Sequence, residues 1–105
     1  MSRTIEQLGE FGLIEQLRRY QRARPGLFAG IGDDAAVLAG PLGYRTLFTT
    51  DMLVEGVHFF PGTDPYALGR KAMAVNLSDI AAMGGTPTFA TVGLGVPPGT
   101  SADRI

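Results

Sequence analysis

Residues 64–85 read DPYALGRKAMAVNLSDIAAMGG and form the strongest helical pattern in the chain. Asp64 followed by Pro65 is a typical helix start, because an aspartate side chain can accept hydrogen bonds from the first turn and proline is tolerated there. The glycine pair that ends the quoted stretch is a typical helix stop. We therefore predict a helix from Pro65 to about Met83.

The second half of this helix carries a polar pair in apolar surroundings. After Lys71, apolar residues occupy every side, so we expect this part to be buried nearly all round. Asn76 and Asp79 are three positions apart and share a face. A buried, ionised Asp79 is costly unless it is paired or bound to a metal, and no Lys or Arg lies within the next turn. Two interpretations stay open: a cation from elsewhere binds Asp79, or Asp79 caps a neighbouring loop.

The remaining elements are shorter and are separated by glycine and proline. The patterns predict a helix at about Glu10–Arg22, strands at Ala35–Ala39, Arg45–Asp51, Val54–Phe60 and Thr88–Val96, and a first helical turn at Ser101–Ile105. With 105 residues the chain is one domain at most. The order of the elements predicts an α+β fold, in which helices pack on one face of a mixed, mostly antiparallel sheet.

Two acidic loops could join Asp79 in a binding site. The Gly30–Asp34 loop combines glycines with adjacent carboxylates, and Thr49–Asp51 offers two hydroxyls and a carboxylate after an apolar strand. Each motif alone is more often a turn without a ligand. Three acidic sites from three elements, however, fit several Mg²⁺ ions around a polyphosphate. The chain has no G-x-x-x-x-G-K-[ST] motif, so a nucleotide site would have to bind phosphate through a different arrangement of residues.

Composition excludes several classes of function. The formal net charge is −1 and the basic residues form no long run, so we expect no nucleic-acid binding. The chain has no cysteine, which excludes disulfides and thiolate sites and suits a reducing cytosol. The start lacks the apolar core of a signal peptide. Residues 80–102 carry no charge, but three prolines argue against a spanning helix, so we expect no membrane contact.

Three further side chains have less distinctive surroundings. His58 is the only histidine and is followed by two phenylalanines, which alone indicates a partly exposed residue at the end of a strand. Arg70 and Lys71, early in the long helix, could reach a phosphate, although a solvated face is the more ordinary interpretation.

Three segments resemble the thiamine-monophosphate kinase family in content, order and spacing. They are residues 30–38 (GIGDDAAVL), 49–59 (TTDMLVEGVHF) and 71–85 (KAMAVNLSDIAAMGG). The resemblance runs from about Gly9 to Pro98. Aminoimidazole ribonucleotide synthetase, selenophosphate synthetase and a hydrogenase maturation factor share versions of the helix and the acidic loops. The segment Val54–Phe59 is what resembles the thiamine enzyme, and the absence of cysteine argues against selenophosphate synthetase.

The resemblance implies transfer of the ATP γ-phosphate to thiamine monophosphate, directly between bound substrates and with several Mg²⁺ ions. It implies that Mg²⁺ is held by five residues: Asp34, Thr49, Thr50, Asp51 and Asp79. It implies that His58 contacts the thiamine phosphate, and that Asp33 has a lesser role. No residue of the chain is assigned as a catalytic acid, base or nucleophile.

The resemblance also implies how the chain is organised. Family members are longer, so we expect residues 1–105 to be a partial amino-terminal domain of the aminoimidazole ribonucleotide synthetase-like fold. It would bind ATP and Mg²⁺ and form a homodimer through its strands in the cytoplasm. Without the carboxy-terminal domain we expect little or no kinase activity. Two alternatives stay open: another ATP-dependent synthetase of the superfamily, and a non-catalytic metal-binding or dimerisation module.

Overall fold

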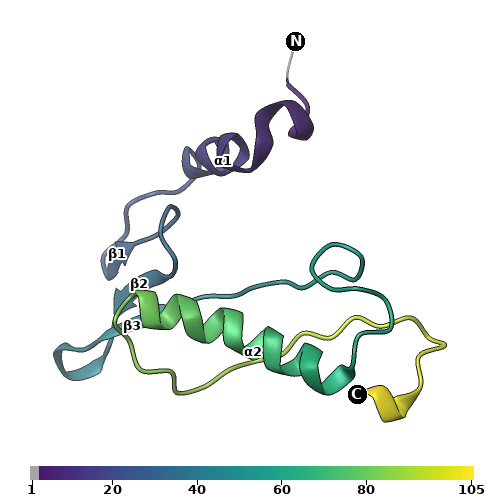
Figure 1. Ribbon diagram of the computed structural model, residues 1–105. Helices are drawn as coiled ribbons and strands as arrows, with labels where there is room; N and C mark the ends of the chain where they lie inside the picture. Colours follow the sequence, from purple (N-terminus) through teal and green to yellow (C-terminus); the bar gives the residue numbers. More distant parts are fainter. Residues whose placement is uncertain (1–2) are drawn as a thin grey trace. The chain divides into compact units, whose positions relative to one another are not determined.

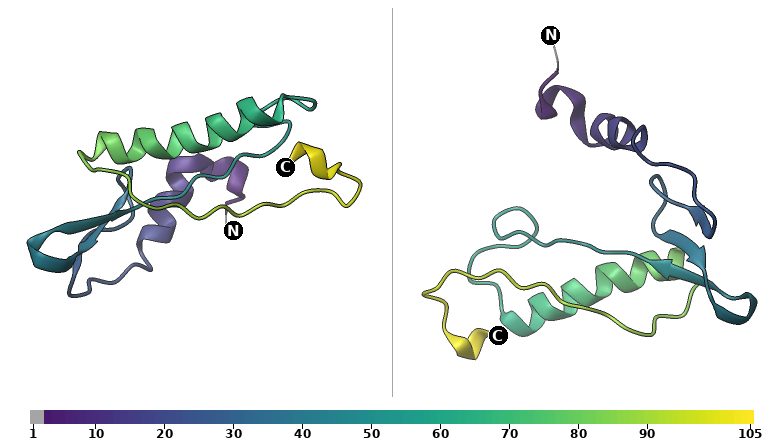
Figure 2. Two further views of the ribbon diagram at one scale, coloured as in Figure 1. Left: turned by 90° about the horizontal axis from the view of Figure 1, so that it is seen from below. Right: turned by 180° about the vertical axis from the view of Figure 1, so that it is seen from behind.

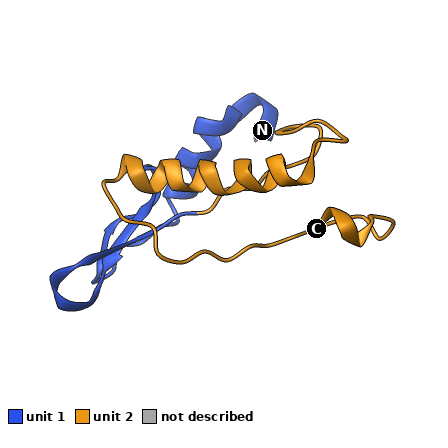
Figure 3. Cartoon of the chain, turned by 60° about the horizontal axis from the view of Figure 1, so that its bottom comes forward, with its two compact units in different colours: residues 1–49 blue, residues 50–105 orange. Residues whose placement is uncertain are grey.

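The computed structural model describes residues 3–105, which divide into two compact units at residue 49 (Figure 3). Each unit is described by itself. The first contains α1 (Ile5–Arg18), β1 (Leu27–Ala29), β2 (Ala36–Ala39), the 3₁₀ turn η1 (Pro41–Gly43) and β3 (Arg45–Phe48). The second contains α2 (Pro65–Ala82) and the 3₁₀ turn η2 (Ala102–Arg104) (Figure 1).

Helix α1 begins and ends earlier than the sequence pattern predicts. The Thr4 hydroxyl accepts a hydrogen bond from the Gln7 amide at 3.2 Å, and the Gln7 side chain accepts one from the Thr4 amide at 2.9 Å. This capping box closes a turn ahead of Gly9, whose φ of 68° kinks the helix. The predicted range Glu10–Arg22 is therefore right in its middle and wrong at both ends.

The three strands of the first unit form an antiparallel sheet in the order β1-β2-β3. Strand β2 pairs with β3 in regular register, with Val37 opposite Leu47, whereas the pairing of β1 with β2 is irregular. The predicted strand Ala35–Ala39 is confirmed to within one residue. The predicted strand Arg45–Asp51 ends early, at Phe48, and β1 was not predicted.

The core of the first unit is small and centres on β2. Ala35 and Val37 are the only buried apolar side chains among the described residues, at 3% and 9% exposure. Val37 is buried because β2 is the middle strand and has neighbours on both sides, and Ala35 directly precedes this strand. Between the two outer strands, the Arg45 guanidinium of β3 lies 4.3 Å from the centre of the Phe28 ring of β1.

Helix α2 matches its prediction because both of its ends are specified locally. The Asp64 carboxylate accepts a hydrogen bond from the Ala67 amide at 3.1 Å. At the other end, the amides of Gly84 and Gly85 bond back to the carbonyls of Ala81 and Ile80, both at 3.0 Å. With φ of 72° at the first glycine, this is a Schellman motif.

The expected burial of α2 is wrong, because no residue of this helix is buried. Met73 and Leu77 keep 44% and 40% of their surface exposed. The side chains of Val75 and Asp79 are half-buried. Apolar residues on all sides of a helix require neighbours on all sides, and the described residues do not supply them.

Two predicted strands of the second unit are also wrong. Residues 54–60 form a tight loop, in which a lone bridge joins Glu55 to Phe59. Residues 88–96 are extended but belong to no strand of the described chain, and Phe89 is fully exposed. A strand needs a partner for its backbone groups, and within residues 3–105 the segment 88–96 has none.

The chain after α2 runs back toward the start of that helix (Figure 2). There the Arg104 guanidinium donates to the Thr63 carbonyl at 3.0 Å. The expected helical turn near the end of the chain is present as η2. Within residues 3–105, neither helix is long and apolar enough to cross a membrane.

Helices and an antiparallel sheet together confirm the α+β class. The main contacts between elements are those between neighbouring strands. Packing of the helices on one face of the sheet therefore stays a prediction.

Candidate functional site

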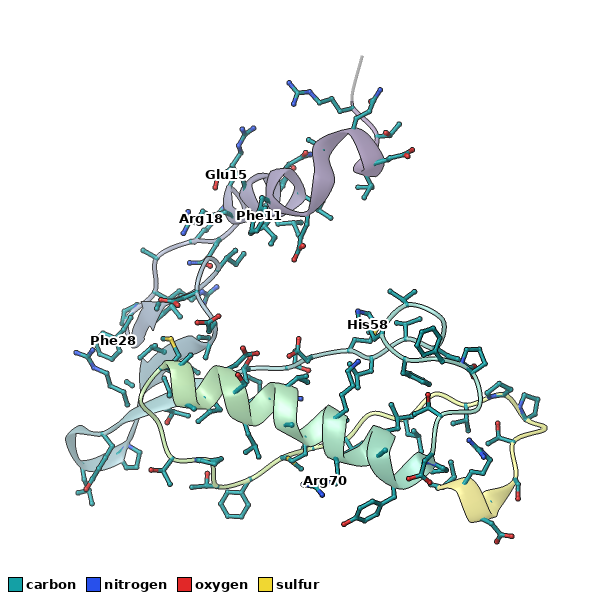
Figure 4. The ribbon with its side chains drawn as sticks, viewed as in Figure 1. Phe11, Glu15, Arg18, Phe28, His58 and Arg70 are labelled. Atoms are coloured by element: carbon teal, nitrogen blue, oxygen red, sulfur yellow. The ribbon has the colours of Figure 1, made fainter. Side chains whose placement is uncertain are left out.

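The Gly30–Asp34 loop is held by the end of α1 and the residues that follow it. The Arg18 guanidinium donates to the Ile31 carbonyl at 3.0 Å, and the Gln21 side-chain oxygen accepts from the Ile31 amide at 2.6 Å. Both backbone groups of one loop residue are thereby satisfied by side chains. Glu15 lies 3.6 Å from Arg18 and adds an ion pair (Figure 4).

The glycines of this loop make room for those same side chains. A Cβ on Gly30 would overlap the amide group of Gln21, and one on Gly32 would overlap the Arg18 guanidinium. Gly32 also has φ of 117°, which L side chains rarely adopt. The space that these two glycines leave beside the loop backbone is therefore filled by two side chains of the protein.

The first unit brings two of the predicted metal ligands together. The Thr49 hydroxyl donates to the Asp34 carbonyl at 3.0 Å, which connects the end of β3 to the acidic loop. Asp33 accepts from the Asp34 amide at 2.8 Å, so its carboxylate shapes the loop. The Asp34 carboxylate is exposed and has no hydrogen-bond or ion-pair partner within residues 3–105.

The other three predicted ligands lie in the second unit. Thr50 and Asp51 follow β3 in an exposed, irregular segment. Asp79 is half-buried on α2, and Asn76 on the same face donates to the Ala72 carbonyl at 2.9 Å. No loop amide within the described chain bonds to Asp79, so the capping interpretation finds no support there.

The donor chemistry of these residues fits Mg²⁺, which prefers carboxylate and hydroxyl oxygens. A complete centre is not assembled, since residues 3–105 contain no group of three or more His, Asp or Glu side chains placed to hold one ion. The ligand assignment from the sequence therefore stays a prediction.

His58 lies in the tight loop that replaces the predicted strand. Its ring nitrogen Nδ1 accepts a hydrogen bond from the Val54 amide at 2.8 Å, and its own amide donates to the Val54 carbonyl at 2.8 Å. Because Nδ1 is an acceptor, the ring proton of the neutral imidazole must be on Nε2. The His58 side chain is exposed, so Nε2–H is a donor available to a ligand.

A small pocket lies at this loop. Its volume is about 110 Å³ and its lining consists of Gly56, Val57, His58, Phe59 and Phe60. The ammonium group of Lys71 on α2 donates to the His58 carbonyl. The positive charge of Lys71 and the exposed ring of His58 at one loop make the surroundings favourable for an anion.

Sequence reasoning missed the three side chains that hold these loops: Arg18, Gln21 and Lys71. Lys71 is exposed, as the interpretation of a solvated face expects, and its ammonium group in addition donates a hydrogen bond to the loop. Each of these bonds joins residues 10 to 13 positions apart, and no local periodicity signals such a pair.

Comparison with known proteins adds independent findings. The family described as "AIR synthase related protein, N-terminal domain" matches residues 32–105. No solved structure matches the chain.

Curated relatives match nearly the whole chain. A thiamine-monophosphate kinase of Mycobacterium tuberculosis is 45% identical over 102 residues, which cover 96% of this chain and 30% of the relative. Enzymes of the same name from Escherichia coli K12 and Synechococcus elongatus are 47% and 44% identical, over 85% and 90% of this chain. The chain spans 28% of each of these two relatives, so in all three cases it covers about three tenths of the relative's length.

Proposed function

The chain belongs to the AIR synthase related family, as its N-terminal domain, and we propose that it acts as the amino-terminal part of a thiamine-monophosphate kinase. The proposed reaction transfers the γ-phosphate of ATP to thiamine monophosphate and yields thiamine diphosphate. The activity belongs to the whole protein, because the chain spans about three tenths of its curated relatives.

The main support for this proposal is the sequence identity between this chain and relatives that all carry the same name. Proteins called thiamine-monophosphate kinase are 44–47% identical over 85–96% of the chain. The family match alone fits any enzyme of the superfamily. The name of these relatives favours the kinase over another ATP-dependent synthetase.

We propose that Asp34, Asp51 and Asp79 bind Mg²⁺, assisted by the hydroxyl oxygens of Thr49 and Thr50. Support comes from the three carboxylates, none of which has a hydrogen-bond or ion-pair partner within residues 3–105. When bound, Mg²⁺ supplies charge neutralisation and alignment of the phosphates. The protein's part would be to hold these oxygens in the loop before β2, directly after β3 and on the last turns of α2.

His58 is proposed to bind the phosphate of thiamine monophosphate. The bond from the Val54 amide to Nδ1 leaves Nε2–H as the donor group of the neutral ring. A donor in a fixed orientation suits a phosphate oxygen, which only accepts hydrogen bonds from it. This residue would orient the acceptor substrate and would take no part in bond making.

Binding to this chain tests the metal assignment. Isothermal titration with Mg²⁺ and ATP should show Mg²⁺-dependent nucleotide binding, which Asp79→Asn removes. The matched control is Asp103→Asn, which makes the same charge change at an exposed position in η2. Equal loss in both variants would show that only net charge matters and would refute the role of Asp79.

Activity is tested on the whole protein by phosphorus-31 NMR. We expect thiamine diphosphate to form from thiamine monophosphate and ATP, and to form only when Mg²⁺ is present. Turnover of ATP with another acceptor, and none with thiamine monophosphate, would refute the proposed function.

The homodimer expected from the sequence is also proposed. Support comes from the uncharged segment 88–96, where Phe89 and Val92 are 100% and 80% exposed. Covering these side chains would remove apolar surface from water. Light scattering should give twice the chain mass, and a constant monomer mass over a wide concentration range would contradict the proposal.

A further inference from the structure

The loop at residues 54–60 closes around a single residue, Val54. Its amide donates to His58 Nδ1, and its carbonyl accepts from the amides of Val57 at 3.0 Å and His58 at 2.8 Å. The Gly56 amide then bonds to the Phe59 carbonyl at 2.8 Å. These bonds are all internal to the loop, so they fix its shape but not its attachment to the rest of the unit.

The attachment comes from α2. Lys71 donates from its ammonium group to the His58 carbonyl. Among the described residues, two side chains outside the loop form a hydrogen bond with a group inside it: Lys71, and Thr63, whose hydroxyl donates to the Phe60 carbonyl at 2.6 Å. Lys71 is the one that comes from α2 and the one that bonds to His58. His58 is thus held at two points, at its ring by Val54 and at its carbonyl by Lys71.

The neighbouring cation has a different position. Arg70 makes no side-chain hydrogen bond or ion pair within residues 3–105. Figure 4 shows Arg70 on the side of α2 away from the loop that carries His58. Consecutive helical residues point about 100° apart, so only one of this pair can reach the loop.

We propose that Lys71 is a positioning residue, which anchors the 54–60 loop so that the Nε2–H group of His58 meets the phosphate of the acceptor substrate. The proposal rests on the kinase function proposed above and adds a residue to that same site. A lysine is suited to this position because one N–H satisfies the carbonyl while the charge stays close to the anion.

The first test does not depend on substrate. Hydrogen exchange is measured by NMR at the Val54 amide, whose acceptor is His58 Nδ1, in Lys71→Met, Lys71→Arg and Arg70→Met. Loss of the anchor in Lys71→Met should speed exchange at Val54 about fivefold, the effect of one net hydrogen bond. Lys71→Arg should restore slow exchange, and Arg70→Met should match the unmodified chain. Unchanged exchange in Lys71→Met would overturn the proposal.

The second test uses thiamine monophosphate with the whole protein. Lys71→Met should raise KM for thiamine monophosphate about fivefold while KM for ATP stays constant, and Lys71→Arg should recover most of the loss. An equal rise in Arg70→Met would show a simple charge effect and would overturn the positioning role. If the unmodified protein does not use thiamine monophosphate, the proposed function fails, and the exchange at Val54 still decides whether Lys71 positions His58.

Discussion

The attachment of the Gly30–Asp34 loop to the end of α1 gives a prediction whose size follows from the structure. The Ile31 amide donates to the Gln21 side chain at 2.6 Å, and both residues are exposed. Replacing Gln21 with Leu keeps a side chain of similar size and removes the acceptor. The net value of such a bond is about 1 kcal/mol, so the Ile31 amide should exchange with solvent about fivefold faster.

The assay is amide hydrogen exchange followed by NMR, read at Ile31 and at Leu47 in β3. Leu47 belongs to the sheet and should keep its rate, because its pairing with Val37 does not involve the loop. The control is Gln16→Leu, an exposed glutamine inside α1 that makes no side-chain hydrogen bond within residues 3–105. An Ile31 rate that is the same in Gln21→Leu and in Gln16→Leu would refute the reasoning.

A second hydrogen bond to Ile31 allows a further test of the same reasoning. Arg18 donates to the carbonyl of the same residue, Ile31, at 3.0 Å. Two bonds to one residue should act together, so the effects of Arg18→Met and Gln21→Leu should not add in the double variant. If Asp34 binds Mg²⁺ as proposed, a loosened loop should also weaken Mg²⁺ binding, which titration can measure.

Three substitutions should change the free energy of unfolding, measured by urea denaturation with circular dichroism. Gly40→Ala should destabilise the protein by about 1–3 kcal/mol, since its Cβ would lie 2.8 Å from the Tyr44 carbonyl oxygen; an unchanged midpoint would contradict this. Gly69→Ala should stabilise it by about 0.5–1 kcal/mol, because its Cβ meets nothing within 4 Å inside α2, and a loss of stability would count against that view. Asp64→Ala should cost about 1 kcal/mol through loss of the N-cap of α2, and Asp64→Ser should restore most of it.

Elements with ends specified by nearby residues could be predicted from the sequence. Helix α2 was predicted to within one residue because its cap and its glycine stop act over three to five positions. Strand β2 followed from a short apolar run between two turns. The start of α1 was missed although its capping box is local, because a short helical turn precedes the kink at Gly9, whose own backbone angles are not helical.

The candidate site was predicted only in part. The sequence indicated which oxygens could bind a cation. The structure brings two of these residues together, since the Thr49 hydroxyl lies 3.0 Å from the Asp34 backbone carbonyl. It could not indicate which side chains hold the loops. The predicted strand at 54–60 failed because Val54 satisfies its backbone groups within its own loop. Its amide donates to the ring of His58, and its carbonyl accepts from the amides of Val57 and His58.

The sequence by itself thus determined α2, strand β2, the start of β3, the α+β class and the family resemblance. These features depend on hydrogen bonds and apolar patterns between residues close along the chain. Three features depend on the tertiary structure alone. They are the hydrogen bonds that join Ile31 to Arg18 and Gln21, the bond from Lys71 to the His58 loop, and the exposure of α2. The bonds from Arg18 and Lys71 each span 13 positions. Contacts of that span depend on the path of the backbone between the two residues, and no spacing rule in the sequence encodes that path.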